Sequence, residues 1–263
     1  MNPGHTPDDA GALAQLRVAS YNIHSCVGID RRCRPNRIAE VLRELDCHVV
    51  ALQEVDNRPG SEEDSMQLDY LSTALQMACI PGLRIVRHTG EYGNALLTRL
   101  PIVSVQRHDL SYSRYEPRGA LDVTLELAGR QLRIIATHLG LSRAERRFQW
   151  QRILPCIAQA EPETPLVILG DMNEWYRGSQ TLRDVNQILG EAPAPVAFPS
   201  YAPCLALSRI WVRPRRALQA VAAHRSVTAR RASDHLPLLA LISVAELFAG
   251  AGCACESGVG ETE

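Results

Sequence analysis

Residues 165–173, PLVILGDMN, constrain the fold of this chain more than any other stretch. The branched apolar residues 166–169 lead to Gly170, a pattern typical of a strand that is buried on both faces and ended by a breaker. Asp171 and Asn173 follow, and residues two apart in a strand point to the same side. An isolated Asp-x-Asn is also common in a plain turn after a strand. The rest of the chain must therefore decide between a ligand pair and a turn.

The length of 263 residues allows one large domain or two small ones. We favour one domain over residues 16–248, between a flexible leader, 1–15, and a flexible tail, 249–263. Hydrophobic residues make up 46% of the chain and charged residues 22%, which excludes disorder of the whole chain. No apolar run approaches the roughly 18 residues of a membrane helix, so we expect no transmembrane segment.

Charge and residue usage exclude several classes of chemistry. The net charge of −1 creates no general attraction to nucleic acid. All 28 basic residues are arginine, so lysine Schiff-base chemistry and a Walker-type phosphate loop are excluded. The first residues lack the basic start and apolar core of a secretory signal. We therefore expect a cytoplasmic protein whose eight cysteines are free thiols.

Hydrophobic periodicity predicts an alternation of strands and helices. The predicted strands are 16–21, 49–52 (ending at Gln53-Glu54), 83–86, 94–98, 121–127, 132–137, 166–169, 210–212 and 236–244. The predicted helices are one that begins at an Asn36 N-cap, 68–75, one opened by a Ser142-x-x-Glu145 capping box, and 182–189. Turns are predicted at 89–93 and 128–130, and loops at 59–65 and 192–203. Arg143, Arg146 and Arg147 fit a solvated helix face better than a nucleic-acid stripe.

Polar side chains that can bind metals or transfer protons stand at the ends of five of these strands. They are Asn22, Glu54, His138, Asp171 with Asn173, and Asp234 with His235. Carboxylate and amide oxygens are the ligands that Mg²⁺ prefers. Histidines transfer protons near neutral pH, and the arginine in YEPRGAL, Arg118, offers a planar fork for a phosphate.

The order of these motifs resembles the endonuclease/exonuclease/phosphatase superfamily, related to DNase I. The matching stretches are YNIH at 21–24, QEV at 53–55, YGNALL at 92–97, RGA at 118–120, ATHL at 136–139, GDMN at 170–173 and SDHLP at 233–237. They span roughly residues 16 to 245. The resemblance implies an α/β (α+β) fold, a four-layered α/β/β/α sandwich of two mostly antiparallel sheets packed face to face. A divalent-metal site is expected where the strand ends meet.

The resemblance also implies a metal site. Glu54 would be the principal Mg²⁺ carboxylate, or would bind Mn²⁺ in its place. Asn22 would be a second ligand or a hydrogen-bond partner, and Asp234 would support the site. His24 serves either the site or the strand end.

The remaining matched residues would handle the phosphoester. Asp171 would activate or orient the attacking water, and Asn173 would hold a phosphate oxygen. His235 would act as general base or phosphate contact, and His138 as the second acid/base residue near the leaving group. Arg118 would bind the scissile phosphate. Tyr92 and Asn94 would shape a phosphate-facing loop or a plain hairpin turn.

One position departs from the family pattern. The family usually has an aspartate, which orients the active-site histidine, in the strand that here reads ALSRIWV (206–212), and Ser208 stands in its place. A serine can hydrogen-bond an imidazole but cannot stabilise its charged form. We therefore expect weaker activity, unless another carboxylate fills in.

The sequence thus predicts a Mg²⁺-dependent phosphodiesterase or phosphatase that uses direct attack of water on phosphorus. A small or lipid-derived phosphodiester is the favoured substrate, since a duplex-DNA enzyme needs a cationic footprint. A nuclease acting on DNA or RNA remains an alternative, as does a non-catalytic phosphoryl-binding relative. We expect a monomer.

Overall fold

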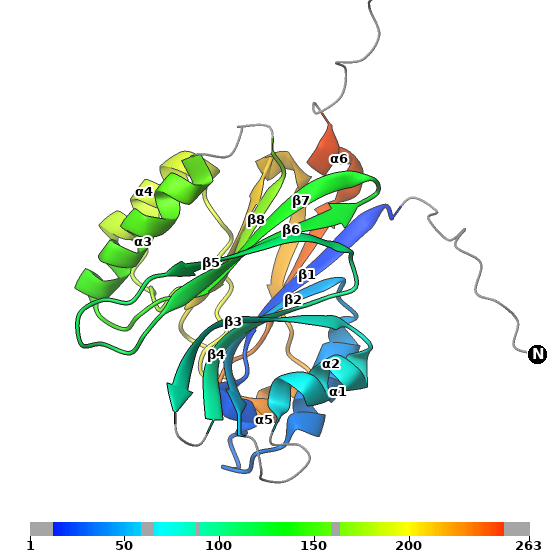
Figure 1. The fold of residues 1–263 in the computed structure, drawn as a ribbon, viewed down its shortest axis with the longest axis vertical. Coiled ribbons are helices and arrows are strands. Elements are labelled where there is room, and N and C mark those ends of the chain that lie inside the picture. The colour runs from blue at the N-terminus through cyan, green and yellow to red at the C-terminus, as the bar shows by residue number, and fades with distance from the viewer. Residues whose placement is uncertain (1–12, 59–65, 88–89, 159–163, 250–263) are drawn as a thin grey trace, which may run out of the picture.

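The computed structural model describes residues 13–58, 66–87, 90–158 and 164–249. Two β-sheets pack face to face, and helices cover the outer face of each sheet (Figure 1). The layers are helix, sheet, sheet and helix. Seven of the nine strand pairs are antiparallel, so the predicted fold class is confirmed.

The first sheet has six strands in the spatial order β10-β11-β1-β2-β4-β3. Their bounds are β1 Gln15–Asn22, β2 Val49–Asn57, β3 Ala78–Arg87, β4 Gly90–Thr98, β10 Leu218–Ala223 and β11 Leu238–Ser243. The second sheet has five strands in the order β5-β6-β7-β8-β9. Their bounds are β5 Ile102–Asp109, β6 Gly119–Leu127, β7 Arg130–His138, β8 Leu166–Asp171 and β9 Ser208–Arg213.

The helices connect and cover the strands. Their bounds are α1 Pro35–Leu45, α2 Gln67–Leu75, α3 Arg143–Ala158, α4 Gln180–Leu189, α5 Ala229–Ala232 and α6 Val244–Phe248, with 3₁₀ turns η1 His24–Cys26 and η3 Arg215–Ala217. Helices α1, α2 and α5 lie on the side of the first sheet, and α3 and α4 on the side of the second (Figure 1). Among the described residues, none of the helices combines the length and the apolarity needed to cross a membrane.

Each sheet contains one parallel pair, and this arrangement places the polar strand ends. Strand β1 pairs with β2 through the α1 crossover, and β7 pairs with β8 through α3. A parallel pair needs such a crossover, and its two strands end at the same edge. Asn22 lies opposite Gln53, and His138 lies opposite Asp171.

Strand β8 is covered on both faces, as the apolar run predicts. Val167 and Leu169 belong to the large core between the two sheets. Leu166 and Ile168 belong to a second cluster, which is shared with residues of α3 and α4. Because the side chains alternate between the two cores, the strand has no solvated face.

Several predicted boundaries are wrong. Helix α1 begins at Pro35 rather than after an Asn36 N-cap, because proline is well suited to the first turn, where its missing N–H costs nothing. Strand β2 does not end at Glu54 but continues to Asn57 across a bulge. Residues 90–93 belong to β4 rather than to a turn, and positions 88–89 lie outside the described residues.

The sequence missed two strands, β5 and β10, which are both at sheet edges. Side chains of β5 are mostly exposed, so its pattern carries no clear alternation. The 128–130 turn and the Ser142–Glu145 capping box are confirmed: the Glu145 N–H donates to Ser142 Oγ at 3.2 Å. The predicted loop 59–65 and nearly all of the leader and tail lie outside the described residues.

The prediction of a solvated arginine face on α3 is wrong in part. Arg143 and Arg147 are exposed. Arg146 is buried, and its guanidinium forms an ion pair with the Glu174 carboxylate at 3.1 Å. The carboxylate partner lies beyond β8, so the local helix pattern could not reveal this pair.

Gly170 allows β8 to approach β7 closely, which leads to a stability prediction. Its φ is +151°, and a Cβ at this position would lie 1.8 Å from the Thr137 carbonyl oxygen. We expect Gly170→Ala to lower the free energy of unfolding by about 3 kcal/mol or more, since backbone must move. Urea denaturation would measure the loss.

Gly129→Ala is the matched control. Gly129 also has a positive φ, +72°, but a Cβ there would meet nothing within 4 Å. We expect this substitution to cost only about 1 kcal/mol, the price of the left-handed conformation. Equal losses in the two variants would show that the close approach at Gly170 is unimportant.

Candidate active site

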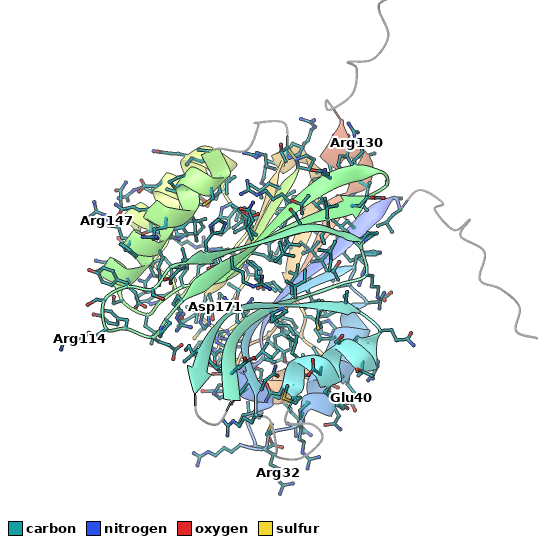
Figure 2. All side chains as sticks on the ribbon, in the orientation of Figure 1. Arg32, Glu40, Arg114, Arg130, Arg147 and Asp171 are labelled. Carbon is teal, nitrogen blue, oxygen red and sulfur yellow. The ribbon has the colours of Figure 1, made fainter. Side chains whose placement is uncertain are left out.

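The Asp171 carboxylate lies at the centre of the polar cluster, at the junction of the two sheets (Figure 2). Its residue is only 1% exposed. Oδ1 accepts a hydrogen bond from the Asn173 backbone N–H at 3.0 Å, and Oδ2 accepts one from Asn22 Nδ2 at 3.2 Å. Burial alone would raise the pKa of this carboxyl, but the nearby His235 imidazole and these donors hold the pKa of Asp171 below its usual range.

Asn22 connects Asp171 to Glu54. Its Nδ2 also donates to Glu54 Oε1 at 2.7 Å, and its Oδ1 accepts from the His24 N–H at 3.0 Å. Glu54 lies on the β2 bulge with φ +59°, a left-handed conformation. The bulge thus aims the Glu54 carboxylate at Asn22, which also bonds Asp171 of the second sheet.

His138, at the end of β7, has a donor group close to each ring nitrogen. Arg118 Nη1 lies 3.0 Å from Nδ1, and Asn173 Nδ2 lies 3.2 Å from Nε2. A guanidinium can only donate, so Nδ1 is the acceptor and the ring proton is assigned to Nε2, 3.9 Å from Asp171 Oδ2. Asn173 Nδ2 then makes no hydrogen bond with Nε2–H and donates to the Leu139 carbonyl instead. Burial and the Arg118 charge lower the pKa of His138 to about 4. His138 is therefore neutral at pH 7.

His235 approaches the same carboxylate from the loop before β11. Its Nε2 lies 3.7 Å from Asp171 Oδ2. Its buried Nδ1 has no hydrogen-bond partner among the described residues. Phe198 packs against the ring, with the centroids 4.6 Å apart. No carboxylate of the described part of the chain thus hydrogen-bonds His235 Nδ1.

Ser233 connects this loop to β1 through hydrogen bonds. Its Oγ donates to the Asn22 carbonyl at 2.8 Å and accepts from the His235 N–H at 3.2 Å. The neighbouring Asp234 is turned toward His24, with Oδ1 3.8 Å from its Nδ1. Asp234 therefore lies beside the cluster and makes no ion pair with its central groups.

A small pocket next to His138 gathers most of the predicted phosphate contacts. It is lined by Glu54, Ile85, Tyr92, Gly93, Asn94, Glu116, Pro117, Arg118, Gly119 and His138. Arg118 Nε is buried without a hydrogen-bond partner in the part of the chain that the structure describes. Asn94 Nδ2 donates to the Gly119 carbonyl at 3.2 Å and so joins the two sheets. Burial and the Glu54 charge raise the pKa of Tyr92, which stays protonated.

The sequence did not single out three residues that shape this cluster. Glu116 forms an ion pair with Arg118 at 3.0 Å, Phe198 packs on His235, and Ser233 makes the bridge described above. Ser233 lies inside the SDHLP motif, so a motif signal existed for it. Phe198 lies in a proline-rich loop and Glu116 in an irregular segment, where the sequence has no periodicity to place them.

The donor set fits a hard divalent cation that keeps most of its waters. No group of three or more His, Cys, Asp or Glu side chains that could hold a metal occurs among the described residues. Glu54 is instead a single, partly exposed carboxylate supported by the Asn22 amide. Mg²⁺ is typically bound by one or two carboxylates, with the remaining positions left to water and substrate phosphate. Zinc, which prefers three or four protein ligands, fits less well.

The four-layered sandwich and the polar cluster where its strands end define a DNase I-like protein. The model of the endonuclease/exonuclease/phosphatase family matches residues 19–235, so the chain belongs to this family. Members are generally phosphoester hydrolases that depend on divalent metals.

Similar proteins cover most of the chain. The uncharacterized protein YbhP of Escherichia coli K12 is 29% identical over 244 residues, which cover 86% of this chain and 96% of YbhP. Zebrafish (D. rerio) TDP2, solved with a single-strand DNA product, has a TM-score of 0.69 at 16% identity and covers 88% of this chain and 100% of that one. A mannosyl-6-phosphatase of Bacteroides thetaiotaomicron has a TM-score of 0.67 at 17% identity, with 86% and 99% covered. At these identities the two structures support the fold alone.

The environment of His138 predicts its titration. We expect the ring to stay neutral, with the proton on Nε2, as the pH falls to about 5, because its pKa is about 4. In the unfolded chain the ordinary value is 6.5, so between these values the unfolded state binds more protons. His138 should therefore make the free energy of unfolding fall as the pH drops from 6.5 towards 4. Ring ¹⁵N chemical shifts would report charge and tautomer directly.

Arg118→Gln is the informative variant. It removes a positive charge 3.0 Å from the ring, so the pKa of His138 should rise. A His138 midpoint near 6.5 in the unmodified protein would contradict the assigned environment.

Proposed function

We propose that this chain hydrolyses phosphoesters with the help of Mg²⁺ and with water attacking phosphorus directly. The observation that carries the proposal is the buried Asp171 carboxylate, which is surrounded by the Asn22 amide and the two imidazoles. Hydrolysis of a phosphoester needs neutralisation of charge, a positioned water and groups that handle protons. Residues suited to each task lie around this carboxylate.

Glu54 would hold the cation, with Asn22 as its hydrogen-bond partner and Asp234 in support through His24. Mn²⁺ would suit the same oxygen donors. When bound, the cation would neutralise charge on the phosphoryl oxygens as a Lewis acid.

Asp171 and His235 would position the attacking water. Their 3.7 Å separation is too long for a direct hydrogen bond and leaves room for a bridging oxygen. As the water oxygen bonds to phosphorus, its proton passes to this pair and the bond to the leaving oxygen breaks. The leaving oxygen then takes a proton from solvent.

Arg118, His138 and Asn173 would hold the phosphoryl group. Arg118 has an unused buried Nε donor beside the pocket. His138 is neutral at pH 7, since its pKa is about 4, so it would donate from Nε2–H rather than act as a charged acid. Asn173, fixed by its bond to the Leu139 carbonyl at 2.8 Å, would complete the cradle. Tyr92 and Asn94 would line the same phosphate-binding pocket.

We propose a small or lipid-derived phosphodiester as substrate. Exposed apolar side chains occur on the loops next to the site residues in sequence: Tyr115, Leu141, Trp175, Tyr176 and Tyr201. They favour a ligand with an apolar body. The net charge of −1 lacks the cationic footprint of a duplex-DNA enzyme. A nuclease remains the alternative, because TDP2 has a single-strand DNA product.

The mechanism predicts the loss of activity in two isosteric variants. Glu54→Gln removes the proposed metal carboxylate, and Asp171→Asn removes the proposed water acceptor. We expect each to lower Mg²⁺-dependent hydrolysis of bis-p-nitrophenyl phosphate by about a thousandfold or more. Circular dichroism would verify the fold, and a panel of phospholipid, phosphoinositide, nucleotide and single-strand DNA substrates would rank the substrate classes.

Glu126→Gln is the control, because Glu126 is an exposed carboxylate near the opposite end of β6 from Gly119. It should leave turnover unchanged. Full turnover in both Glu54→Gln and Asp171→Asn would rule the mechanism out.

A second candidate function is a phosphoryl-binding protein that has lost turnover. The unpartnered Nδ1 of His235, with Ser208 in place of the orienting aspartate, favours it. Loss of such a carboxylate lowers the rate by about 10⁴-fold in a strongly coupled catalytic triad. The loss is about 10 to 100-fold when the carboxylate only supports a site residue from outside the site. The two candidates therefore differ in whether turnover is low or absent.

Ser208→Asp separates these candidates. We expect it to raise kcat by about 10 to 100-fold, since a carboxylate would then orient His235 and stabilise its charged form. Ser208→Asn introduces a side chain of the same size as aspartate but without its charge, so it should raise kcat much less. If neither the unmodified protein nor Ser208→Asp turns over any substrate of the panel while phosphate still binds, the binding protein is correct.

We also propose a monomer in the cytoplasm. Four cysteines of the described residues are free thiols: Cys47, Cys79, Cys156 and Cys204. Free thiols are what a reducing compartment favours.

A further inference from the structure

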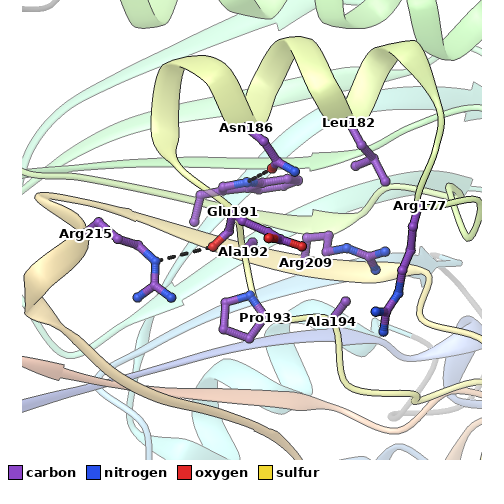
Figure 3. A pocket seen from close by; sticks show the side chains of 10 residues that line it. Arg177, Leu182, Asn186, Glu191, Ala192, Pro193, Ala194, Arg209 and Arg215 are labelled. Atoms are coloured by element: carbon purple, nitrogen blue, oxygen red, sulfur yellow. Dashed lines mark hydrogen bonds between the residues drawn. The ribbon is translucent and has the colours of Figure 1, made fainter.

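A second pocket lies on the outer face of the second sheet, away from the Asp171 cluster. It has a volume of about 370 Å³ and is lined by Arg177, Leu182, Asn186, Glu191, Ala192, Pro193, Ala194, Arg209, Trp211 and Arg215. Helix α4 forms its roof, and Arg177 and Arg215 stand at opposite ends with Arg209 between them (Figure 3). This volume is within the range of small-molecule sites.

Strand β9 separates this pocket from the candidate active site. Consecutive strand residues point to opposite faces. Ser208 lies opposite Asp171 in the β8–β9 register, and Arg209 lies opposite Gly170. Arg209 thus faces the α4 side, where Trp211, two residues on, also lines the pocket. A ligand of this pocket would be distinct from the phosphoester at Asp171.

Arg209 carries a buried charge that no carboxylate of the described residues contacts directly. The residue is 3% exposed, and no carboxylate of the described residues forms an ion pair with it. Three of its N–H groups donate to the carbonyls of Ala206, Ser208 and Glu174. The remaining donors of the guanidinium have no protein partner in the described part of the chain. The Glu174 and Asp171 carboxylates stabilise this charge only at longer range, and a buried charge without a direct ion pair is costly.

Arg177 adds to the free-energy cost of burying the Arg209 charge. It is exposed, makes no hydrogen bond within the described residues, and lies near enough to Arg209 for the two charges to repel. Burial and Arg177 together lower the pKa of Arg209 to about 10, against the opposing effect of the Glu174 and Asp171 carboxylates. The Arg209 guanidinium is therefore charged at pH 7. Two like charges beside one cavity are stabilised when an anion lies between them.

The lining residues also limit the kind of anion. Arg177, Arg209 and Arg215 face one acid, Glu191, which leaves the pocket with a net charge of +2. Arg215 Nε donates to the Glu191 carbonyl at 3.3 Å, so its remaining N–H groups are free to bind a ligand (Figure 3). Guanidinium forks match phosphate oxygens. A dianionic phosphate balances this charge better than a single carboxylate.

The remaining walls are suited to an organic group. Leu182, Pro193, Ala194 and Trp211 present apolar surface. Asn186 Oδ1 accepts from Trp211 Nε1 at 3.1 Å (Figure 3). Its Nδ2 is therefore held as a donor, with no protein acceptor among the described residues.

We propose that this pocket is a binding site for a small organic phosphate monoester, separate from the site of phosphoester hydrolysis. The phosphate would lie between Arg209 and Arg177, and the organic group would pack against Trp211 and Pro193. The ligand would also fix Arg177, which follows Asn173 by four residues in the loop after β8. Ligand binding in this pocket would therefore affect the candidate active site through this loop.

Calorimetry at low ionic strength would test the proposal on the full chain, with EDTA present to prevent turnover. Phenyl phosphate is the probe, with inorganic phosphate and benzoate as comparison ligands. We expect one phenyl phosphate per chain, bound more tightly than either comparison ligand. Hydrogen exchange should show protection over residues 182–194.

Variants assign the binding to this pocket. Arg177→Gln, an exposed change that leaves the fold intact, should weaken phenyl phosphate by about tenfold or more, and Arg209→Met should weaken it further. Arg147→Gln is the matched control, because Arg147 is an exposed arginine on α3 that does not line the pocket. Arg118→Gln, which alters the candidate active site, should leave this binding intact.

Three outcomes would overturn the proposal. They are no binding at millimolar phenyl phosphate, equal binding in Arg177→Gln and the unmodified protein, and loss of binding in Arg118→Gln alone. The last would assign the ligand to the candidate active site. Because binding is measured without turnover, failure of the proposed hydrolysis would leave this result unaffected.

Discussion

The burial of one carboxylate, that of Asp171, is the constraint on which the candidate active site depends. A buried charge must be met by donors or opposite charges. Here the donors come from both sheets: the Asn22 amide from the first, and the Asn173 N–H from the loop after β8 in the second. The position of the Asp171 carboxylate therefore depends on how the two sheets pack, and so does the geometry of the site.

Backbone conformation gives this cluster its shape. Glu54 and Asn173 have φ of +59° and +49°, and His24 has +46°, all in a region that non-glycine residues seldom adopt. Such strain persists only when the surrounding structure fixes it, and it clusters at functional sites. At Glu54, the β2 bulge aims the carboxylate at Asn22. At Asn173, the turn points the backbone N–H toward Asp171, to which it donates a hydrogen bond.

Strand β9 connects the candidate active site with the second pocket, because its neighbouring residues point to opposite faces. Ser208 lies opposite Asp171 in the β8–β9 register. Arg209, on the other face, brings a buried positive charge to a second pocket. The loop after β8 connects the two, since it holds Asn173 beside His138 and Arg177 beside Arg209. Ligand binding at one face would therefore be expected to influence the other.

The family and most strand positions could be predicted from the amino-acid sequence, because motifs and apolar periodicity are visible along the chain. The layered sandwich followed from the family resemblance. PLVILGDMN is the clearest case: strand β8 and its polar end follow from nine residues. The contacts that these strand ends make could not be predicted in this way. The bulge at Glu54, the buried pair of Arg146 with Glu174, the Phe198 contact with His235 and the arginine pocket all join residues distant in sequence. Such contacts depend on how strands and loops pack, and local pattern carries no record of them.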